Sequence, residues 1–327
     1  MNKQQHVVAA FALIGILAGS SAAPRAQDFP TRPITIVVPF PPGGSIDVVM
    51  RAMAPQLQER LGQPIVIENR AGGGGVIGAT AVAKAPPDGH MLYAAPSSFA
   101  ANPKLARSLP YDTLKDFETV ALLARTPLVL VVNPNVPAKS VPELIALLKQ
   151  KPDALSFAHS GPGSSPHRSA ELFQAMTGTK MNGVSYRGVV PGLRDVMAGH
   201  VALMFADAGS AMPQITAGTV RALGVTSSAR LPAAPDIPTI AEAGVAGYHA
   251  ESWLLICVPA QTPKPVVARL HAELKAVAAT PEIRSIIVKF GNIPVDSAPP
   301  EQLHKFLLTE IERWGGIIEK AGVAGTQ

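Results

Sequence analysis

Short runs of β-branched and apolar residues alternate with helix-like segments along most of the chain, and this alternation limits the possible folds more than any other feature. Strand-like runs are expected at residues 34–38, 65–67 and 91–95, with helices at 46–61 and 76–85 between them. This order is typical of parallel sheets whose faces are covered by helices. It predicts the α/β class, with a β-α-β-α-β opening.

The same alternation resumes in the second part of the chain. Strands are expected at residues 128–132, 155–158, 184–186, 201–205 and 222–226, and helices at 141–149, from 166 onward and at 189–198. An apolar run at 253–258 and helical patterns at 265–278 and 300–321 follow. Because domains average roughly 150 residues, the length suits two α/β units, each with its own core.

The N-terminus has the features of an export signal. Lys3 precedes an uninterrupted small and apolar run at residues 7–18, which suits a signal peptide and is shorter than the roughly 20 residues that cross a bilayer. We expect cleavage after Ala26, so that residues 1–26 are a signal peptide and the mature chain is periplasmic. The only cysteine is Cys257, so we expect neither an intrachain disulfide nor a lipid anchor on an N-terminal cysteine.

The charged residues and histidines argue against several classes of partner. The formal net charge is +5, without a basic run or interleaved aromatic residues, so nucleic acid is not an expected partner. The 8 histidines form no H-E-x-x-H or Cys/His pattern, and we expect no metal and no cofactor. No close pair of acidic residues points to acid–base catalysis.

A glycine-rich motif at residues 40–47 lies between the first expected strand and helix. It contains Gly43, Gly44, Ser45 and Asp47. Glycines leave backbone N–H groups accessible at a helix N-terminus, where an anion is favoured. The alternative is a capped helix, with Ser45 as the N-cap and Asp47 complementing the helix dipole.

A second motif, at residues 69–78, contains Gly74 and Gly75 within a formal G-x-G-x-x-G. A dinucleotide site would also need an acidic residue at the end of the next strand, about 20 positions on. That strand is followed by Ser97 and Ser98 instead. An anion-binding loop or a plain turn remain as the alternatives, and Ser97 is itself a candidate ligand contact.

A third motif, at residues 161–167, contains Ser164, Ser165 and His167. Ser165 as N-cap, with Pro166 at the first helical position, is a common helix start. These side chains could equally face a ligand cleft. A hydrolase that uses Ser164 and His167 is a rival interpretation, although the sequence shows neither a G-x-S-x-G frame around the serine nor an evident acidic partner.

Further polar side chains end strands of the second unit, where α/β sheets bind ligands. Tyr186 and Arg187 end one strand, and Asp207 ends the next. Arg187 could pair with a carboxylate or be a solvated surface residue. Asp207 could orient a ligand or cap a turn, and Trp253 is interpreted as packing between the units.

Taken together, these motifs resemble those of the Bug family, the substrate-binding receptors of tripartite tricarboxylate transporters. The resemblance covers nearly the whole mature chain and rests on motifs in order at residues 40–47, 69–78, 87–89, 163–167, 186–188, 204–207, 221–227 and 238–244. It implies a two-lobed periplasmic-binding-protein type II fold, with each lobe a mostly parallel sheet flanked by helices and two crossings, near residues 125–130 and 251–258. The first lobe would comprise residues 27–125 and 251–327, and the second residues 126–250.

The resemblance also implies a function. Family members bind small organic acids between the lobes, including dicarboxylates, citrate, acidic amino acids and some aromatic acids, and deliver them to membrane permease subunits. The expected ligand contacts are Gly43, Gly44, Ser45, Asp47, Gly74, Gly75, Ser97, Ser164, Ser165, His167, Tyr186, Arg187 and Asp207. We expect a monomeric receptor rather than an enzyme, and a sensor that signals to a membrane partner without transport is the other possibility. Arg168 departs from the family, where this position is commonly apolar.

Overall fold

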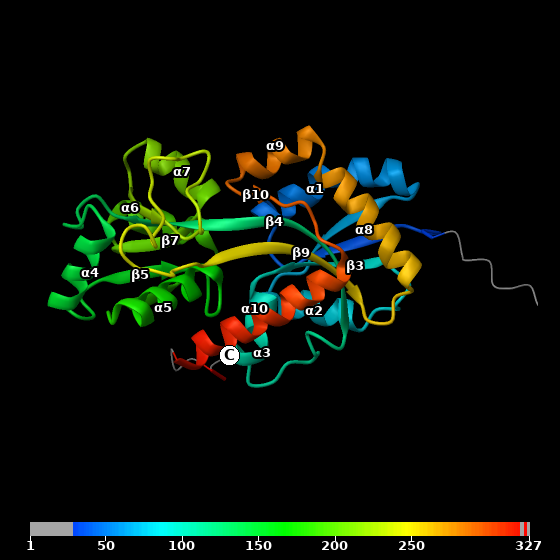
Figure 1. Ribbon diagram of the computed structural model, residues 1–327, viewed down its shortest axis with the longest axis horizontal. Coiled ribbons are helices and arrows are strands. Elements are labelled where there is room, and N and C mark those ends of the chain that lie inside the picture. The colour runs from blue at the N-terminus through cyan, green and yellow to red at the C-terminus, as the bar shows by residue number, and fades with distance from the viewer. Residues whose placement is uncertain (1–28, 321–323, 326–327) are drawn as a thin grey trace, which may run out of the picture.

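The computed structural model describes residues 29–320 and 324–325, and it shows an elongated α/β protein with two lobes (Figure 1). The expected signal peptide lies outside the described residues. Two long strands, β4 and β9, run through the middle of the molecule and connect the lobes. The expected α/β class and two-lobed arrangement are confirmed.

The first lobe opens with alternating strands and helices, as the sequence predicts. The elements are β1 (Ile34–Val38), α1 (Ser45–Leu61), β2 (Ile65–Asn69), the 3-10 turn η1 (Gly73–Gly75), α2 (Val76–Ala83), β3 (Met91–Pro96) and α3 (Ser98–Leu105). β1 lies between β2 and β3 and is parallel to both. Each strand is therefore followed by a helix that returns the chain to the start of the next strand.

The second lobe repeats this pattern. The elements are β4 (Phe117–Val132), α4 (Val141–Gln150), β5 (Ser156–His159), α5 (Ser165–Thr177), β6 (Asn182–Ser185), α6 (Val189–Ala198), β7 (Leu203–Asp207), α7 (Ala208–Thr216) and β8 (Arg221–Val225). β5 lies between β6 and β7 and is parallel to both.

The chain then returns to the first lobe. The returning elements are β9 (Glu251–Pro259), α8 (Lys264–Ala278), α9 (Pro281–Lys289), β10 (Ile293–Pro294) and α10 (Pro300–Lys320). α10 runs back along the molecule, and its C-terminal end approaches the second lobe (Figure 1). None of the helices in the described part of the chain is both long enough and apolar enough to cross a membrane.

The connection between the lobes follows from the pairing of β4. Residues 117–127 of β4 pair with β9, and residues 128–132 pair with β7 and β8. This change of partners falls inside the segment expected for the first crossing. Every antiparallel pairing between two named strands involves β4 or β9. The exact residue limits of the two lobes stay a prediction.

The central strands are apolar on both faces because helices cover both faces of the sheet. In β1, Ile36 and Val38 belong to one hydrophobic cluster, while Val37 between them belongs to another. In β4, Val129 and Leu130 likewise belong to different clusters. Each fully buried side chain of this kind contributes roughly 1.5–3 kcal/mol. The continuous apolar runs of the sequence therefore become the middle layer of the fold.

The sequence interpretation missed three helices, α3, α7 and α9, and began β4 too late. α3 and α7 contain Pro103 and Pro213, and proline is normally a sign that a helix ends. β4 begins at Phe117, and its first half is buried almost continuously. It therefore lacks the polar–apolar alternation that indicates a strand.

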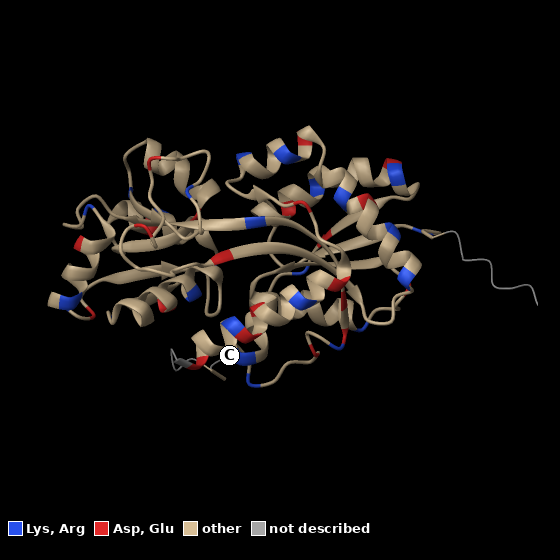
Figure 2. Ribbon diagram, in the orientation of Figure 1, with Lys and Arg blue, Asp and Glu red and all other residues tan. Residues whose placement is uncertain are grey.

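Charged side chains are distributed over both lobes. Lys and Arg lie interspersed with Asp and Glu on the helices and loops, and no single-sign face is evident in this view (Figure 2).

Candidate functional site

The directions of the strands bring the candidate loops of both lobes to one junction. β3 is antiparallel to β9 and β9 is antiparallel to β4, so β1, β2 and β3 run with β4 toward the second lobe. β7 is antiparallel to β4, so β5, β6 and β7 run back toward the first lobe. The carboxyl ends of both sets of parallel strands therefore face the region between the lobes, where α/β sheets bind ligands.

The first glycine-rich loop leads into α1, which begins without a side-chain cap. The N-cap is Gly44 and not Ser45, which is the first helical residue. Gly43 and Gly44 are exposed. Because the first N–H groups of a helix have no partner within it, this helix start can accept an anion.

The Asp47 carboxylate is buried and hydrogen-bonded within the protein. Asp47 is 2% exposed, and its Oδ2 accepts a hydrogen bond from the Gly43 N–H at 2.9 Å. Its Oδ1 accepts from the Asn69 side chain at 2.9 Å, and Arg51 donates to both oxygens. Burial alone would raise the pKa of Asp47, but these hydrogen bonds outweigh burial and hold the pKa below its usual value. Asp47 thus fixes the first loop against the end of β2.

The second glycine-rich loop is a tight turn that only glycine can form. Residues 72–75 all have positive φ, between 56° and 133°. A Cβ at Gly75 would lie 2.8 Å from the hydroxyl of Tyr93. Gly74 is exposed, and its carbonyl accepts a hydrogen bond from Ser98 at 2.8 Å. The Gly75 N–H is used within the turn, where it donates to Gly72 at 3.0 Å. α2 also begins without a side-chain cap.

The third motif is a capped helix start. Ser164, and not Ser165 as expected, is the N-cap of α5, and its Oγ accepts from the His167 N–H at 3.5 Å. Ser165 is the first residue of the helix. Its Oγ lies 3.2 Å from the Oγ of Ser97, in the turn between β3 and α3. These two candidates join the first lobe to the second.

His167 holds the same loop in place. Its Nδ1 accepts a hydrogen bond from the Gly163 N–H at 3.1 Å, so the proton of the neutral ring is on Nε2. Burial, together with the nearby His159 and Arg168, lowers the pKa of His167 to about 4. In the described part of the chain, neither ring nitrogen is hydrogen-bonded to Ser164. The pair therefore lacks the contact that would activate a serine nucleophile.

The remaining candidates of the second lobe differ in whether their polar groups are already hydrogen-bonded within the protein. The hydroxyl of Tyr186 donates to Asp195 at 2.7 Å, so its proton is used within the lobe. Arg187 is exposed beside Gly188, the N-cap of α6, and α6 also begins without a side-chain cap. Asp207 caps α7, because its carboxylate accepts from the N–H and the hydroxyl of Ser210 at 2.9 and 3.0 Å. The capping alternative for Asp207 is thus observed.

Three residues at the junction were not identified as site residues from the sequence. Ser252 lies 2.9 Å from Ser97, and Arg168 donates to the same hydroxyl at 2.5 Å. Asn292 donates to Ser45 at 2.5 Å. Ser252 and Asn292 belong to no motif, and all three contacts are tertiary, so the spacing of residues in the sequence gave no signal for them.

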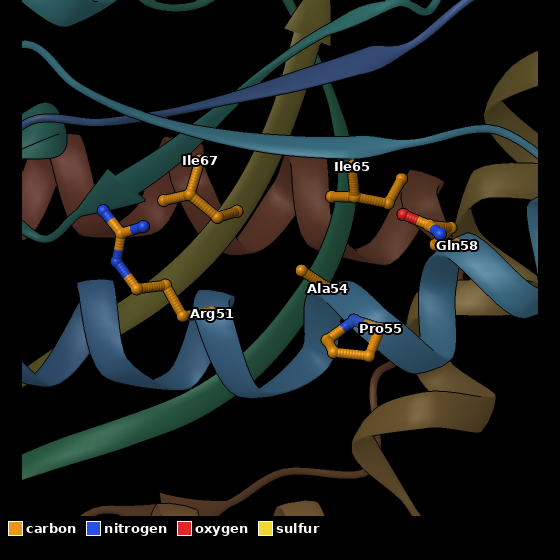
Figure 3. Close-up of a pocket in the computed structure, with 6 residues that line it drawn as sticks. All are labelled: Arg51, Ala54, Pro55, Gln58, Ile65 and Ile67. Atoms are coloured by element: carbon orange, nitrogen blue, oxygen red, sulfur yellow. The ribbon is translucent and has the colours of Figure 1, made fainter.

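Trp253 is buried and presents no face to a ligand. It is 1% exposed, packs edge-to-face against Phe306 of α10 with ring centroids 5.6 Å apart, and donates to Glu310 at 3.0 Å. Within the described residues, no three or more His, Cys, Asp or Glu side chains gather as a metal site. A separate groove between α1 and the edge strand β2 includes none of the expected contacts (Figure 3). It is lined by Arg51, Ala54, Pro55, Gln58, Ile65 and Ile67.

Comparisons with known proteins agree on one family. Residues 49–323 match the model of the tripartite tricarboxylate transporter family receptor. The chain is 38% identical to the protein BugT of Bordetella pertussis over 316 residues, which cover 95% of this chain and 97% of BugT.

Two solved structures share both sequence and fold with the chain. An R. palustris protein solved with adipate is 37% identical, with a TM-score of 0.83, and the match covers 90% of this chain and 99% of that protein. MatC from Rhodopseudomonas palustris, solved with bound malate, is 34% identical with a TM-score of 0.79, and the match covers 89% and 100% of the two chains.

Proposed function

The chain belongs to the tripartite tricarboxylate transporter family of receptors, and from this membership we propose that it captures a small organic carboxylate between its two lobes. The observation that carries the proposal is that helices with a glycine at the N-cap follow parallel strands whose carboxyl ends face the region between the lobes. α1, α2 and α6 begin at Gly44, Gly75 and Gly188, and none of these helices has a side-chain cap. Their free N–H groups and positive dipole ends favour a negatively charged group.

The size of these effects favours direct hydrogen bonds to the ligand. A helix dipole near an anion contributes typically about 0.3–1 kcal/mol, while a hydrogen bond to a charged group contributes about 1.5–3 kcal/mol. Two N–H groups that bind one carboxylate therefore contribute more than the dipole. Gly43 and Gly75 use their own N–H groups within the loops, so the N–H groups at Gly44, Ser45 and Gly74 are the better candidates.

The relatives indicate which acids to test first. The R. palustris protein was solved with adipate and MatC with malate, and both molecules are small dicarboxylates. We infer that the present chain binds an acid of similar size. Di- and tricarboxylates, acidic amino acids and aromatic acids remain the classes to test.

Closure of the lobes completes the site in this proposal. The ligand binds first to the loops of the first lobe, and bending of β4 and β9 brings Ser164, Ser165 and His167 over it. Hinge closure around a ligand is the usual behaviour of two-lobed binding proteins. The closed form then delivers the solute to the permease subunits of a tripartite transporter. We also infer that the mature protein is a periplasmic monomer.

The structure offers little support for a hydrolase. The Nδ1 of His167 accepts a hydrogen bond from the Gly163 N–H, and the Oγ of Ser164 accepts one from the His167 backbone N–H. Each group therefore stabilises the loop. The matched family model is that of a receptor, and MatC was solved with bound malate, which supports a role without catalysis.

Isothermal titration calorimetry with a panel of organic acids tests this function. We expect saturable binding of at least one small carboxylate with one site per chain, together with a rise in melting temperature, because a ligand that binds only the folded state stabilises it. The matching uncharged amide of the same acid serves as the control. Absence of heat and of stabilisation at millimolar concentration across the panel would refute the proposal.

A further inference from the structure

Arg168 carries a buried positive charge at the junction of the lobes. It is 2% exposed, although it lies in the first turn of α5 beside the candidate loop. Its Nη1 donates to the Gly163 carbonyl at 2.6 Å, and its Nη2 donates to the Ser97 hydroxyl at 2.5 Å. The guanidinium also lies 4.3 Å from the ring centroid of Trp314 in α10. Arg168 therefore contacts both lobes.

The charges around Arg168 do not cancel. Glu310 accepts hydrogen bonds from two indole N–H groups and pairs with Arg313 at 3.2 Å. Arg125 pairs with Glu251 at 3.5 Å. No carboxylate in the described part of the chain lies within 4.0 Å of the Arg168 guanidinium. One cation is thus left without a direct counter-charge.

A buried cation in this position is unfavourable. The pKa of Arg168 is lowered to about 9, mainly by burial; Glu310 opposes this shift and Arg313 adds to it. The Nε of Arg168 has no hydrogen-bond partner among the described residues. Burying a charge is costly unless it is paired and hydrogen-bonded. An anion that enters the adjacent junction would supply the missing negative charge.

We propose that Arg168 determines specificity by favouring solutes with two carboxylates over solutes with one, a role that rests on the proposed carboxylate-binding function. One carboxylate binds the N–H groups at the starts of α1 and α2. The other lies against the hydroxyl pair of Ser97 and Ser165, with the Arg168 charge behind it. Ser97 is fully buried, but Ser165 is half-buried and lies 3.2 Å from it. The cation is therefore two hydrogen bonds away from a surface that a ligand can reach.

The Arg168 guanidinium determines which hydrogen bonds the Ser97 hydroxyl can make. A guanidinium has no acceptor, so the Ser97 oxygen must accept from Arg168, and the Ser97 proton is left to donate to Ser165 or Ser252. A unit charge at about 8 Å, in an effective dielectric of about 20, changes the affinity for a carboxylate more than tenfold. A monocarboxylate whose carboxylate binds the first-lobe helices lies farther from Arg168, so the charge of Arg168 raises its affinity less.

Calorimetry with adipate and hexanoate tests this inference, because the two acids match in length and differ by one carboxylate. We expect the wild-type protein to prefer adipate by about tenfold or more. Arg168→Met keeps the length of the side chain, and we expect it to reduce this preference about tenfold. Arg168→Lys should keep most of the preference. Arg230→Gln removes an exposed arginine that is paired with Glu242, and it should leave the preference unchanged.

The outcomes separate this inference from the function it rests on. Equal losses of affinity for both acids in Arg168→Met would show that Arg168 only holds the lobes together, and would overturn the inference. A wild-type preference for hexanoate would overturn it even if the Met variant did not fold. If the wild-type protein bound carboxylates from the wider panel without preferring the diacid, the proposed role of Arg168 would be refuted and the proposed function would stand. If it bound no carboxylate at all, the proposed function would also be refuted.

Discussion

The side-chain amide of Asn292 donates a hydrogen bond to the Ser45 hydroxyl at 2.5 Å, although the two residues are 247 positions apart in the chain. Asn292 is 5% exposed and directly precedes β10, and Ser45 is the first residue of α1. Since the Ser45 oxygen accepts from Asn292, its own proton is free to donate elsewhere. The returning chain therefore orients a hydroxyl in the first candidate loop.

Asn292→Ala should weaken ligand binding through its effect on Ser45. We expect a loss of about 0.5–1.5 kcal/mol in binding free energy, the usual contribution of one hydrogen bond. A double-mutant cycle with Ser45→Ala, measured by calorimetry, checks this. The two losses should be clearly less than additive. Fully additive losses would show that Asn292 does not act through Ser45.

Gly44→Asp should block the anion site without harming the fold. Gly44 has φ −74° and ψ 164°, which any residue can adopt, and a Cβ there would meet only the Pro41 carbonyl at 3.8 Å. Aspartate is a preferred N-cap, so its carboxylate would occupy the N–H groups of α1 and repel a negatively charged ligand. We expect affinity to fall at least about tenfold and the melting temperature to stay equal or rise.

Gly44→Asn is the matched control, since it caps the helix without a charge. It should reduce affinity less than Gly44→Asp. Unchanged carboxylate affinity in the Asp variant would place the ligand away from the start of α1.

Asp47→Asn should reduce stability in a pH-dependent way. The pKa of Asp47 is lowered in the folded protein, so its contribution is present above the unfolded pKa of about 3.9 and is lost as pH falls through the folded value. Removing the charge should cost about 1–3 kcal/mol at pH 7, and the difference from wild type should shrink below about pH 4. Urea unfolding over a pH series measures this. The exposed Asp236→Asn is the matched control. A pH-independent difference between Asp47→Asn and the wild type would contradict the prediction.

Gly209→Ala should disturb the contact between the lobes on the side of α7. A Cβ at Gly209 would overlap the Phe290 carbonyl, and a Cβ at Gly291 would overlap the backbone of residues 208 and 209. Neither backbone can yield as a flexible side chain could, so we expect a cost of about 1–3 kcal/mol and a larger radius of gyration in X-ray scattering. Gly316→Ala, where a Cβ meets nothing within 4 Å, is the control. An unchanged radius and stability in Gly209→Ala would mean that this contact is dispensable.

Much of the fold could be predicted from local patterns. The run at β1 is β-branched, and the glycines at 43–44 and 72–75 end strands and begin helices, so both the elements and the loops that face the junction follow from the sequence. The predicted N-caps, Ser45 and Ser165, each lie one residue after the observed N-caps, Gly44 and Ser164. The N-cap is defined by its backbone conformation and by the N–H it satisfies, and residue type alone does not fix either.

The roles of individual side chains were harder to predict. Asp47 and Asp207 carry the charge that a polar ligand could use, yet neighbouring N–H groups occupy their carboxylates. The Tyr186 hydroxyl likewise has a partner within the protein, because it donates to Asp195. The contacts of Ser97 with Arg168 and Ser252 join residues 71 and 155 positions apart. Such contacts depend on how the lobes pack, which no spacing rule describes.

Diffraction from crystals grown with the tightest-binding acid of the panel tests the central claim most directly. We expect electron density for one carboxylate within hydrogen-bond distance, about 2.7–3.2 Å, of the N–H groups at the start of α1, with the rest of the acid enclosed between the lobes. Density for the acid elsewhere, for example in the groove between α1 and β2, with the region between the lobes holding only solvent, would contradict it.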